Sequence, residues 1–282
     1  IGALIPPSIL MIIYGILAET SVTQVFLGGI TIGILTAVSY VIVVLLISYF
    51  RPDLIPRHIP EDGESSFKAL FKIWPMLVLV LLVFGGLFSG FFSATESGAV
   101  GALGALILGI ITRGLNWAAF QKSLLETVMT TSSLFIIAVG AVMFTRFLGL
   151  TGLSGFLNST VAGADLSYFQ LMLIIVLIYL ALGTFMEPFG AMLVTLPVFL
   201  PILKDADISL VWFGVLVVKL LEIGMITPPV GLNVFVIKNV ASKYVTVVQI
   251  FKGVIPFIIA DLFVVALVIA LPGIVLFLPN FM

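Results

Sequence analysis

Long uncharged apolar runs, separated by short polar intervals, make up almost the whole chain. A helix needs about 20 apolar residues to cross a membrane, because each residue advances it about 1.5 Å through a hydrocarbon core about 30 Å thick. The pattern therefore predicts an all-α polytopic membrane protein. Its expected membrane segments are 25–50, 73–95, 97–112, 127–145, 166–186, 188–203, 208–237 and 253–278.

Two of the apolar regions contain the same helix-breaking phrase, which reads IGALIPP at 1–7 and IGMITPP at 223–229. Proline has no N–H and its ring clashes with the preceding turn, so a Pro-Pro pair interrupts a helix. One interpretation is a simple kink, since membrane helices tolerate proline. The other is an unwound turn whose free carbonyls bind a cation, followed by a half-helix whose N-terminus attracts an anion.

The repeat continues beyond the prolines, because LAETSVT at 17–23 is matched by VASKYVT at 240–246. The two copies differ in charge. The first copy contains no Lys or Arg, whereas lysines accompany the second copy at positions 238, 243 and 252. Lys and Arg are retained on the cytoplasmic side of a membrane, so the copies are expected to end on opposite faces. This pattern predicts an inverted-topology repeat.

The repeat and the apolar runs together divide the chain into segments. Because the chain begins at Ile1, inside the first copy of the phrase, we interpret it as the carboxy-terminal part of a longer chain. The expected segments are 1–24, half of a broken helix with an amphipathic connector; 25–72, a span and a cytoplasmic loop; 73–148, membrane helices; 149–203, an outer segment and a re-entrant hairpin; 204–252, the second broken helix and its connector; and 253–282, the last span.

The stretch GTFMEPFG at 183–190 gathers polar and flexible residues between two apolar arms, which is typical of a hairpin tip. Two geometries fit. Either both arms cross the membrane and Glu187 is a solvated turn carboxylate at the cytoplasmic surface, or the arms re-enter from outside and the tip stops at mid-membrane. The second arm is short and contains Pro197 and Pro201, which favours re-entry. At mid-depth a carboxylate is costly, and Glu187 would then be a functional candidate.

Composition narrows the function. Hydrophobic residues make up 62% of the chain and charged residues 9%, and the formal net charge is −1. This balance gives no basic surface for a nucleic-acid partner, and no interval is large enough for a soluble catalytic domain. The chain has one His and no Cys, so it has no conventional transition-metal ligand cluster, and it lacks a Gly-Lys-Ser/Thr nucleotide loop. We therefore do not expect an enzyme.

Polar residues near the breaks suit ion or solute binding. At the second break Gly224 lets the backbone open, Thr227 supplies a hydroxyl oxygen and Asn233 supplies an amide. At the first break only Ser8 is comparable. Charged residues also occur inside the apolar segments of the second half. Lys219 and Glu222 are three residues apart on one helix and are expected to pair, and Asp261 is expected to face a cavity or a partner helix.

Three motifs carry a resemblance to a known family. IGALIPPS at 1–8, FMEP at 185–188 followed by TLP at 195–197, and above all IGMITPPVGLN at 223–233 resemble the large membrane subunit (M subunit) of tripartite ATP-independent periplasmic (TRAP) transporters. The resemblance covers the whole chain. It implies an elevator-type, inverted-repeat fold of the ion-transporter-superfamily kind, located in the bacterial inner membrane. It also implies Na⁺ symport of a carboxylate-bearing organic anion of the sialic acid or C4-dicarboxylate type, a small Q-type membrane subunit, and a P-type periplasmic binding protein that delivers the substrate.

The resemblance also implies which residues bind. In that family each sodium site is formed by a hairpin tip and the following broken helix. The second sodium site would comprise Gly183, Thr184 and Met186 together with Gly224, Thr227 and Val230, and the surviving half of the first would comprise Gly2 and Ile5, with Ser8 beside them. Substrate contacts are expected from Pro6, Pro7, Ser8, Glu187, Pro188, Pro228, Pro229 and Asn233. The family often has Asp where Glu187 stands, and its first hairpin would precede Ile1.

Two alternatives remain open from the sequence. Coupling to protons rather than to sodium would make Glu187 or Asp261 the carrier. A channel or another non-transporting membrane module is the alternative from a different functional class. The sequence does not choose among carboxylate substrates.

Overall fold

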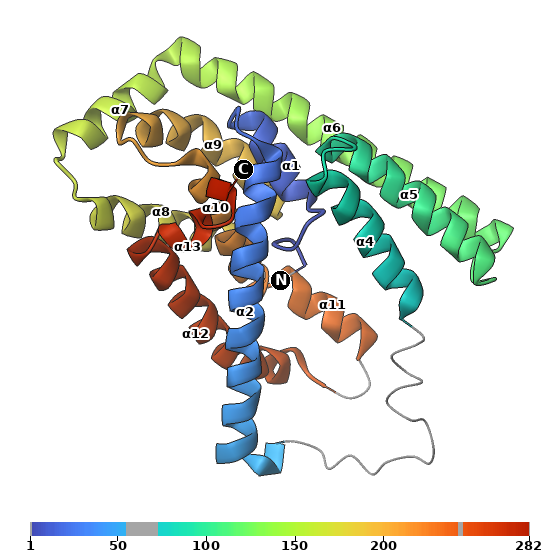
Figure 1. The fold of residues 1–282 in the computed structure, drawn as a ribbon. Helices are drawn as coiled ribbons and strands as arrows, with labels where there is room; N and C mark the ends of the chain where they lie inside the picture. Colours follow the sequence, from blue (N-terminus) through green and yellow to red (C-terminus); the bar gives the residue numbers. More distant parts are fainter. Residues whose placement is uncertain (1, 55–72, 242–244, 282) are drawn as a thin grey trace. The chain divides into compact units, whose positions relative to one another are not determined.

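The computed structural model describes residues 2–241, except 55–72, and residues 245–281. Within these ranges every regular element is a helix (Figure 1). The chain forms two compact units, one made of Ile1–Ile47 with Leu134–Met282 and the other of Ser48–Ser133. Most of the predicted cytoplasmic loop, and Lys243, lie outside the described residues.

The smaller unit is a helical hairpin continued by the start of a long helix. Helix α4 (Trp74–Phe88) and helix α5 (Ala94–Ile111) pack against each other. Ser93 caps α5, because its hydroxyl accepts the N–H of Glu96 at 3.3 Å while the Glu96 carboxylate accepts the N–H of Ser93 at 2.8 Å. Helix α6 (Trp117–Thr151) passes from the smaller unit into the larger one and is longer than the expected segment 127–145.

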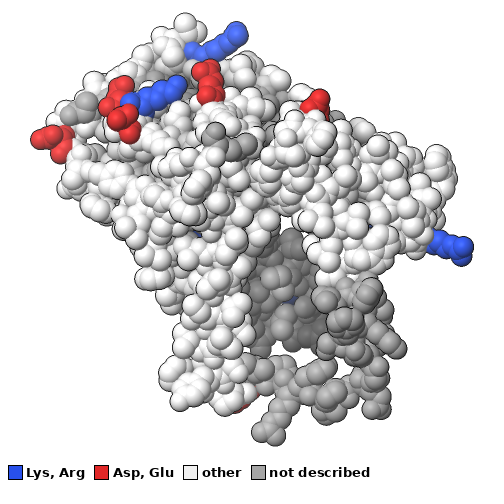
Figure 2. All heavy atoms as spheres, in the orientation of Figure 1, with Lys and Arg blue, Asp and Glu red and all other residues white. Residues whose placement is uncertain are grey.

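The larger unit contains the two copies of the repeat and the predicted hairpin. Five helices of the described chain are long and apolar enough to cross a membrane, namely α2 (Val22–Phe50), α6 (Trp117–Thr151), α8 (Tyr168–Phe185), α9 (Pro188–Asp205) and α12 (Val247–Ala270). Figure 2 shows a face that carries few charged side chains over most of its area. The chain is therefore a multi-pass membrane protein. The remaining described helices are α1 (Ile9–Leu17), α7 (Leu153–Gly163), α10 (Leu210–Gly224), α11 (Leu232–Val240) and α13 (Gly273–Leu276), and short 3₁₀ turns lie at Pro52–Leu54 and Pro279–Phe281.

Helix α10 forms the core of the larger unit. All its residues from Trp212 to Leu221 are buried, as expected for a helix that is apolar on every side. It contacts α1, α8, α9, α12 and α13 (Figure 1). The indole N–H of Trp212 donates to the carbonyl of Val268 at 3.1 Å, which ties the start of α10 to the end of α12.

The two copies of the repeat share their local structure. Each break is followed by a nine-residue helix, α1 or α11, then by a connector and a long helix, α2 or α12. The long helices begin with matching caps, since the N–H of Gln24 donates to the Ser21 hydroxyl and the N–H of Gln249 donates to the Thr246 hydroxyl, both at 3.3 Å. The peptide bond within each Pro-Pro pair is cis. The opposite membrane orientation of the copies stays a prediction.

Candidate cation site at a hairpin tip and a broken helix

The second copy of the phrase ends one helix and starts another. Helix α10 stops at Gly224, and α11 starts after Gly231, whose φ of 59° lies in the left-handed region that favours glycine. Pro228 and Pro229 lack the N–H groups that would close the next helical turn onto Gly224 and Met225. Instead the N–H of Thr227 donates to Gly224 O at 3.1 Å, and the N–H of Asn233 donates to Met225 O at 3.0 Å. The break is thus a defined turn with proline on its exposed side.

The predicted hairpin tip joins α8 to α9. Met186 is extended, with φ −113° and ψ 152°, and its N–H donates to Leu182 O at 2.7 Å. Pro188 is the first residue of α9 and has no N–H to offer the carbonyl of Thr184. Glu187 caps α9, because its Oε2 accepts the N–H of Gly190 at 3.0 Å. A helix end with unpaired carbonyls therefore lies directly before a helix start.

The hairpin tip and the break are in direct backbone contact. A Cβ added to Gly224 would lie 2.4 Å from the carbonyl carbon of Gly183 and 2.7 Å from its oxygen. Real Cβ atoms do not approach backbone this closely, so only glycine fits at this position. The structure thus brings together the hairpin and break segments that carry the residues expected at the second sodium site.

Helix α12 indicates how deep this contact lies along the helices. Lys219 lies beside Asp261 of α12, at an N–O distance of 2.5 Å, and a Cβ on Gly231 would meet the Phe251 ring at 2.9 Å. Gly224 lies five residues beyond Lys219, about 7 Å farther along α10, and so falls between these two levels. Gly224, which contacts the hairpin tip, therefore lies in the chain between two contacts with α12, and the depth of the tip in a membrane stays a prediction.

Two threonine hydroxyls near the contact make the same hydrogen bond, each to the carbonyl four residues earlier. Thr184 donates its hydroxyl proton to Leu180 O at 2.6 Å, and Thr227 donates its proton to Ile223 O at 2.7 Å. Each hydroxyl oxygen keeps acceptor lone pairs after this bond. Both threonines can therefore offer oxygen to a cation without giving up their existing hydrogen bonds.

The donor chemistry of this site suits a hard monovalent cation. Among the described residues, no group of three or more His, Cys, Asp or Glu side chains could hold a metal ion. The oxygens at the tip and the break come from backbone carbonyls and hydroxyls, which are hard ligands. The residues predicted to bind sodium lie on these two segments, and sodium binding by them stays a prediction: Gly183, Thr184, Met186, Gly224, Thr227 and Val230. The glycine pair lets the two backbones come into direct contact.

The first copy of the phrase packs differently. The carbonyl oxygen of Leu4 lies against α2, where a Cβ on Gly29 would be 2.5 Å from it. The N–H of Ala3 donates to Glu222 Oε1 at 2.9 Å and so links the first copy to α10. Sequence reasoning missed both contacts. The spacing of Gly29 and Gly33, which places small residues on one face of α2, is the signal that could have indicated the first of them.

Some of the other residues expected to bind at the first copy already have contacts within the chain. Ser8 is buried and caps α1, and its hydroxyl accepts the N–H of Met11 at 3.4 Å. Pro6 is buried, whereas Gly2, Ile5 and Pro7 are exposed. The first copy therefore packs against α2 and α10. No hairpin tip lies among its described neighbours.

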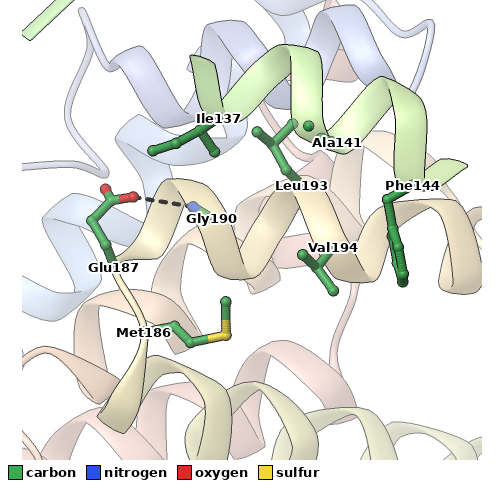
Figure 3. A pocket seen from close by; sticks show the side chains of 9 residues that line it. Ile137, Ala141, Phe144, Met186, Glu187, Gly190, Leu193 and Val194 are labelled. Atoms are coloured by element: carbon green, nitrogen blue, oxygen red, sulfur yellow. Dashed lines mark hydrogen bonds between the residues drawn. The ribbon is translucent and has the colours of Figure 1, made fainter. Parts of the chain in front are cut away.

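A cavity of about 470 Å³ lies beside the hairpin tip (Figure 3). Helix α6 forms one wall and α9 the other, and Glu187 is the one charged side chain in its lining. Glu187 caps α9, and its expected contact with a substrate stays a prediction. The cavity is lined by Ile137, Gly140, Ala141, Phe144, Met186, Glu187, Gly190, Leu193 and Val194.

The charged residues inside the apolar segments are paired within the chain. Lys219 pairs with Asp261 rather than with Glu222, because the two residues lie on facing helices, α10 and α12. Tyr40 of α2 also donates its hydroxyl to Asp261, at 2.7 Å. The prediction of a Lys219–Glu222 pair is therefore wrong, and the partner of Asp261 belongs to its own chain.

Comparison with known proteins places the chain among membrane transporter subunits. The model of the family described as "Tripartite ATP-independent periplasmic transporter, DctM component" matches residues 1–274. The C4-dicarboxylate TRAP transporter large permease protein DctM of Pseudomonas aeruginosa is 32% identical over 285 residues, covering 100% of the chain and 65% of that protein. The sialic acid TRAP transporter large permease protein SiaM of Vibrio cholerae is 31% identical, covering 99% of the chain and 65% of that protein. The chain thus spans about two thirds of the length of these relatives.

Proposed function

On the premise that the chain belongs to the DctM component family of tripartite ATP-independent periplasmic transporters, we propose that it forms part of a sodium-coupled importer of a carboxylate-bearing organic anion. The family consists of transporters and not of enzymes. Relatives named for C4-dicarboxylate and for sialic acid support a carboxylate substrate. The small membrane subunit, the periplasmic binding protein and the inner-membrane location belong to the same proposal.

The close contact between Gly183 and Gly224 carries the proposal. It aligns the unpaired carbonyl end of α8 with the turn that ends α10, so that oxygens from both segments can surround one small cation. Bound sodium supplies a positive charge that favours a nearby anion. The start of α11 adds N–H groups and the positive end of a helix dipole, and Asn233 adds an exposed amide beside them.

We also propose that the hairpin re-enters the membrane rather than crossing it. Its tip contacts the break in α10, and this break lies in the chain between the contacts that Lys219 and Gly231 make with α12, which supports a mid-membrane position. The hairpin and the broken helix would then move together as one unit, in the elevator manner that the family resemblance implies. Pro228 and Pro229 are exposed at the break, where a substrate would contact this unit, whereas Pro188 is buried at the start of α9.

Uptake by proteoliposomes tests the coupling. The full-length protein with its small subunit and binding protein is reconstituted, and uptake of labelled succinate and of labelled sialic acid is measured with an inward gradient of NaCl or of KCl. We expect uptake of one of the two substrates to require sodium and the loaded binding protein. Uptake that proceeds equally well in KCl would overturn sodium coupling.

A threonine variant tests the site itself. Thr227→Ala removes a proposed ligand oxygen and is expected to raise the half-saturating sodium concentration about 10-fold, or about 1.4 kcal/mol, while the substrate KM changes less than about 2-fold. The matched control is Thr112→Ala, directly after α5, because the Thr112 hydroxyl donates to Leu108 O at 2.7 Å in the same manner. Unchanged sodium dependence in Thr227→Ala would count against this residue as a ligand.

A further inference from the structure

Three helices of the larger unit meet at a buried polar cluster. Lys219 of α10 and Asp261 of α12 form an ion pair whose side chains are each 2% exposed, with Nζ 2.5 Å from Oδ1. The Tyr40 hydroxyl of α2 donates to the other carboxylate oxygen, Oδ2, at 2.7 Å. The ammonium also lies 6.0 Å from the centroid of the Tyr40 ring. Both oxygens of the carboxylate are therefore occupied by groups of the chain itself.

A charge pair in this position constrains geometry more than it stabilises the fold. Removing two charges from water is costly, and the attraction between them compensates only when the ions are close and their remaining hydrogen bonds are satisfied. Separating Lys219 from Asp261 would leave two uncompensated buried charges. Sliding α10 by one residue along α12 moves each of its side chains about 1.5 Å and rotates it by about 100°, which breaks the pair.

The same helix carries the cation site a short distance away. Gly224 lies five residues after Lys219, and Glu222, between them, accepts the N–H of Ala3. At Gly224 the approach of the Gly183 backbone leaves no space even for a Cβ. A small displacement of α10 would therefore open or close the contact on which the oxygens of the hairpin and the break converge.

We propose that Lys219, Asp261 and Tyr40 are positioning residues that fix the register of α10 against α12 and thereby set the sodium affinity of the site at Gly183 and Gly224. The inference rests on the proposed sodium coupling. The cluster acts as a fixed ion pair, in contrast to the alternative in which Asp261 carries a coupling proton. This assigns a function to the two buried charges that neither the sodium site nor the substrate contacts use.

Sodium-dependent thermal stability tests the inference without a transported substrate. The full-length protein, purified with its small subunit, is heated over a series of NaCl concentrations, with choline chloride holding the ionic strength constant. A ligand that binds only the folded state stabilises it by RT ln(1 + [L]/Kd), so fitting the rise in Tm against the NaCl concentration gives the sodium Kd. We call this half-saturating concentration the sodium midpoint. A purely structural change lowers Tm in choline chloride but leaves that midpoint unchanged.

Variants of the ion pair test whether it positions α10 for sodium binding. Lys219→Met and Asp261→Asn each leave one unmatched buried charge and are expected to raise the sodium midpoint at least about 10-fold. The double variant removes both charges and is expected to return the midpoint to within about 3-fold of the wild type. Tyr40→Phe removes one hydrogen bond and is expected to shift the midpoint about 3-fold. Lys252→Met, which changes an exposed lysine of α12, is the matched control and is expected to shift nothing.

Each outcome supports or overturns the positioning role of Lys219, Asp261 and Tyr40. Single variants with a wild-type midpoint would overturn the positioning role. A double variant as impaired as the single variants would also overturn it, because removing the unmatched charge would then not restore the sodium affinity. If the single variants do not fold, the midpoints of the double variant and of Tyr40→Phe decide. A wild type that sodium does not stabilise would overturn the proposed coupling and this inference with it.

Discussion

The two copies of the Pro-Pro phrase share a backbone design but have different neighbours. In the second copy the backbone of Gly224 contacts that of Gly183 at a hairpin tip, so the break lies against the end of another helix. In the first copy the Leu4 carbonyl lies close to Gly29, within the continuous helix α2. The phrase therefore determines where a helix breaks, whereas a glycine on the neighbouring element determines which backbone approaches the break.

The long helices that follow the two copies differ in the same way. The register that aligns Ser21 with Thr246 also aligns Thr36 of α2 with Asp261 of α12. Asp261 is ion-paired, whereas the buried hydroxyl of Thr36 has no hydrogen-bond partner within the described chain. A neutral hydroxyl at this position needs no counter-ion. The second copy thus differs from the first in having a charge pair that fixes its register.

The largest effect is expected from a methyl group at the second break. Gly224→Ala places a Cβ 2.4 Å from backbone that cannot move aside, so we expect the free energy of unfolding to fall by about 3 kcal/mol and sodium stabilisation to be lost. Unfolding in detergent, with and without NaCl, measures both. Gly253→Ala is the control, because a Cβ there meets nothing within 4 Å. Wild-type stability for Gly224→Ala would show that the two backbones are not in contact.

A smaller effect is expected in the first copy. Gly29→Ala meets the Leu4 carbonyl oxygen at 2.5 Å and the flexible Met11 side chain at the same distance, and it should cost about 2 kcal/mol of unfolding free energy. Because this contact lies on α2 and not at a hairpin tip, the half-saturating sodium concentration of the second site should stay unchanged. Gly140→Ala, with open space around its Cβ, is the control. A sodium shift as large as that of Thr227→Ala would show that the copies are coupled more closely than their contacts indicate.

The sequence predicted local features well and long-range pairing poorly. The breaks were predictable because proline acts on its own turn, and the hairpin tip because polar residues gather between apolar arms. The partner of Lys219 was predicted wrongly, since spacing along one helix indicates Glu222 but cannot reveal Asp261 on a facing helix. The Gly29 contact was missed for the same reason. The Gly183–Gly224 pairing followed from the family resemblance and not from spacing.

A third prediction concerns the link between the copies. The Tyr14 hydroxyl of α1 donates to Leu210 O at 2.6 Å, at the start of α10, and its side chain is fully buried. Tyr14→Phe leaves that carbonyl without this donor and should lower the free energy of unfolding by about 1.5 kcal/mol. Tyr49→Phe, at an 81% exposed position, should have no measurable effect. Equal stability of the two variants would mean that α1 does not hold the first copy against α10.

The smallest effect is expected at Glu187, which has no counterpart among the described residues of the first copy. Glu187→Ala removes the acceptor for the Gly190 N–H and should cost about 1 kcal/mol, as loss of a helix cap does, whereas Glu187→Gln keeps an acceptor oxygen and should cost less. If capping is its whole contribution, Glu187→Gln retains sodium-driven uptake with an unchanged pH profile. Loss of coupled uptake in Glu187→Gln, at wild-type stability, would instead make this carboxylate a participant in transport. It would also show that the second copy differs from the first by a carboxylate that takes part in transport, as well as by its neighbours.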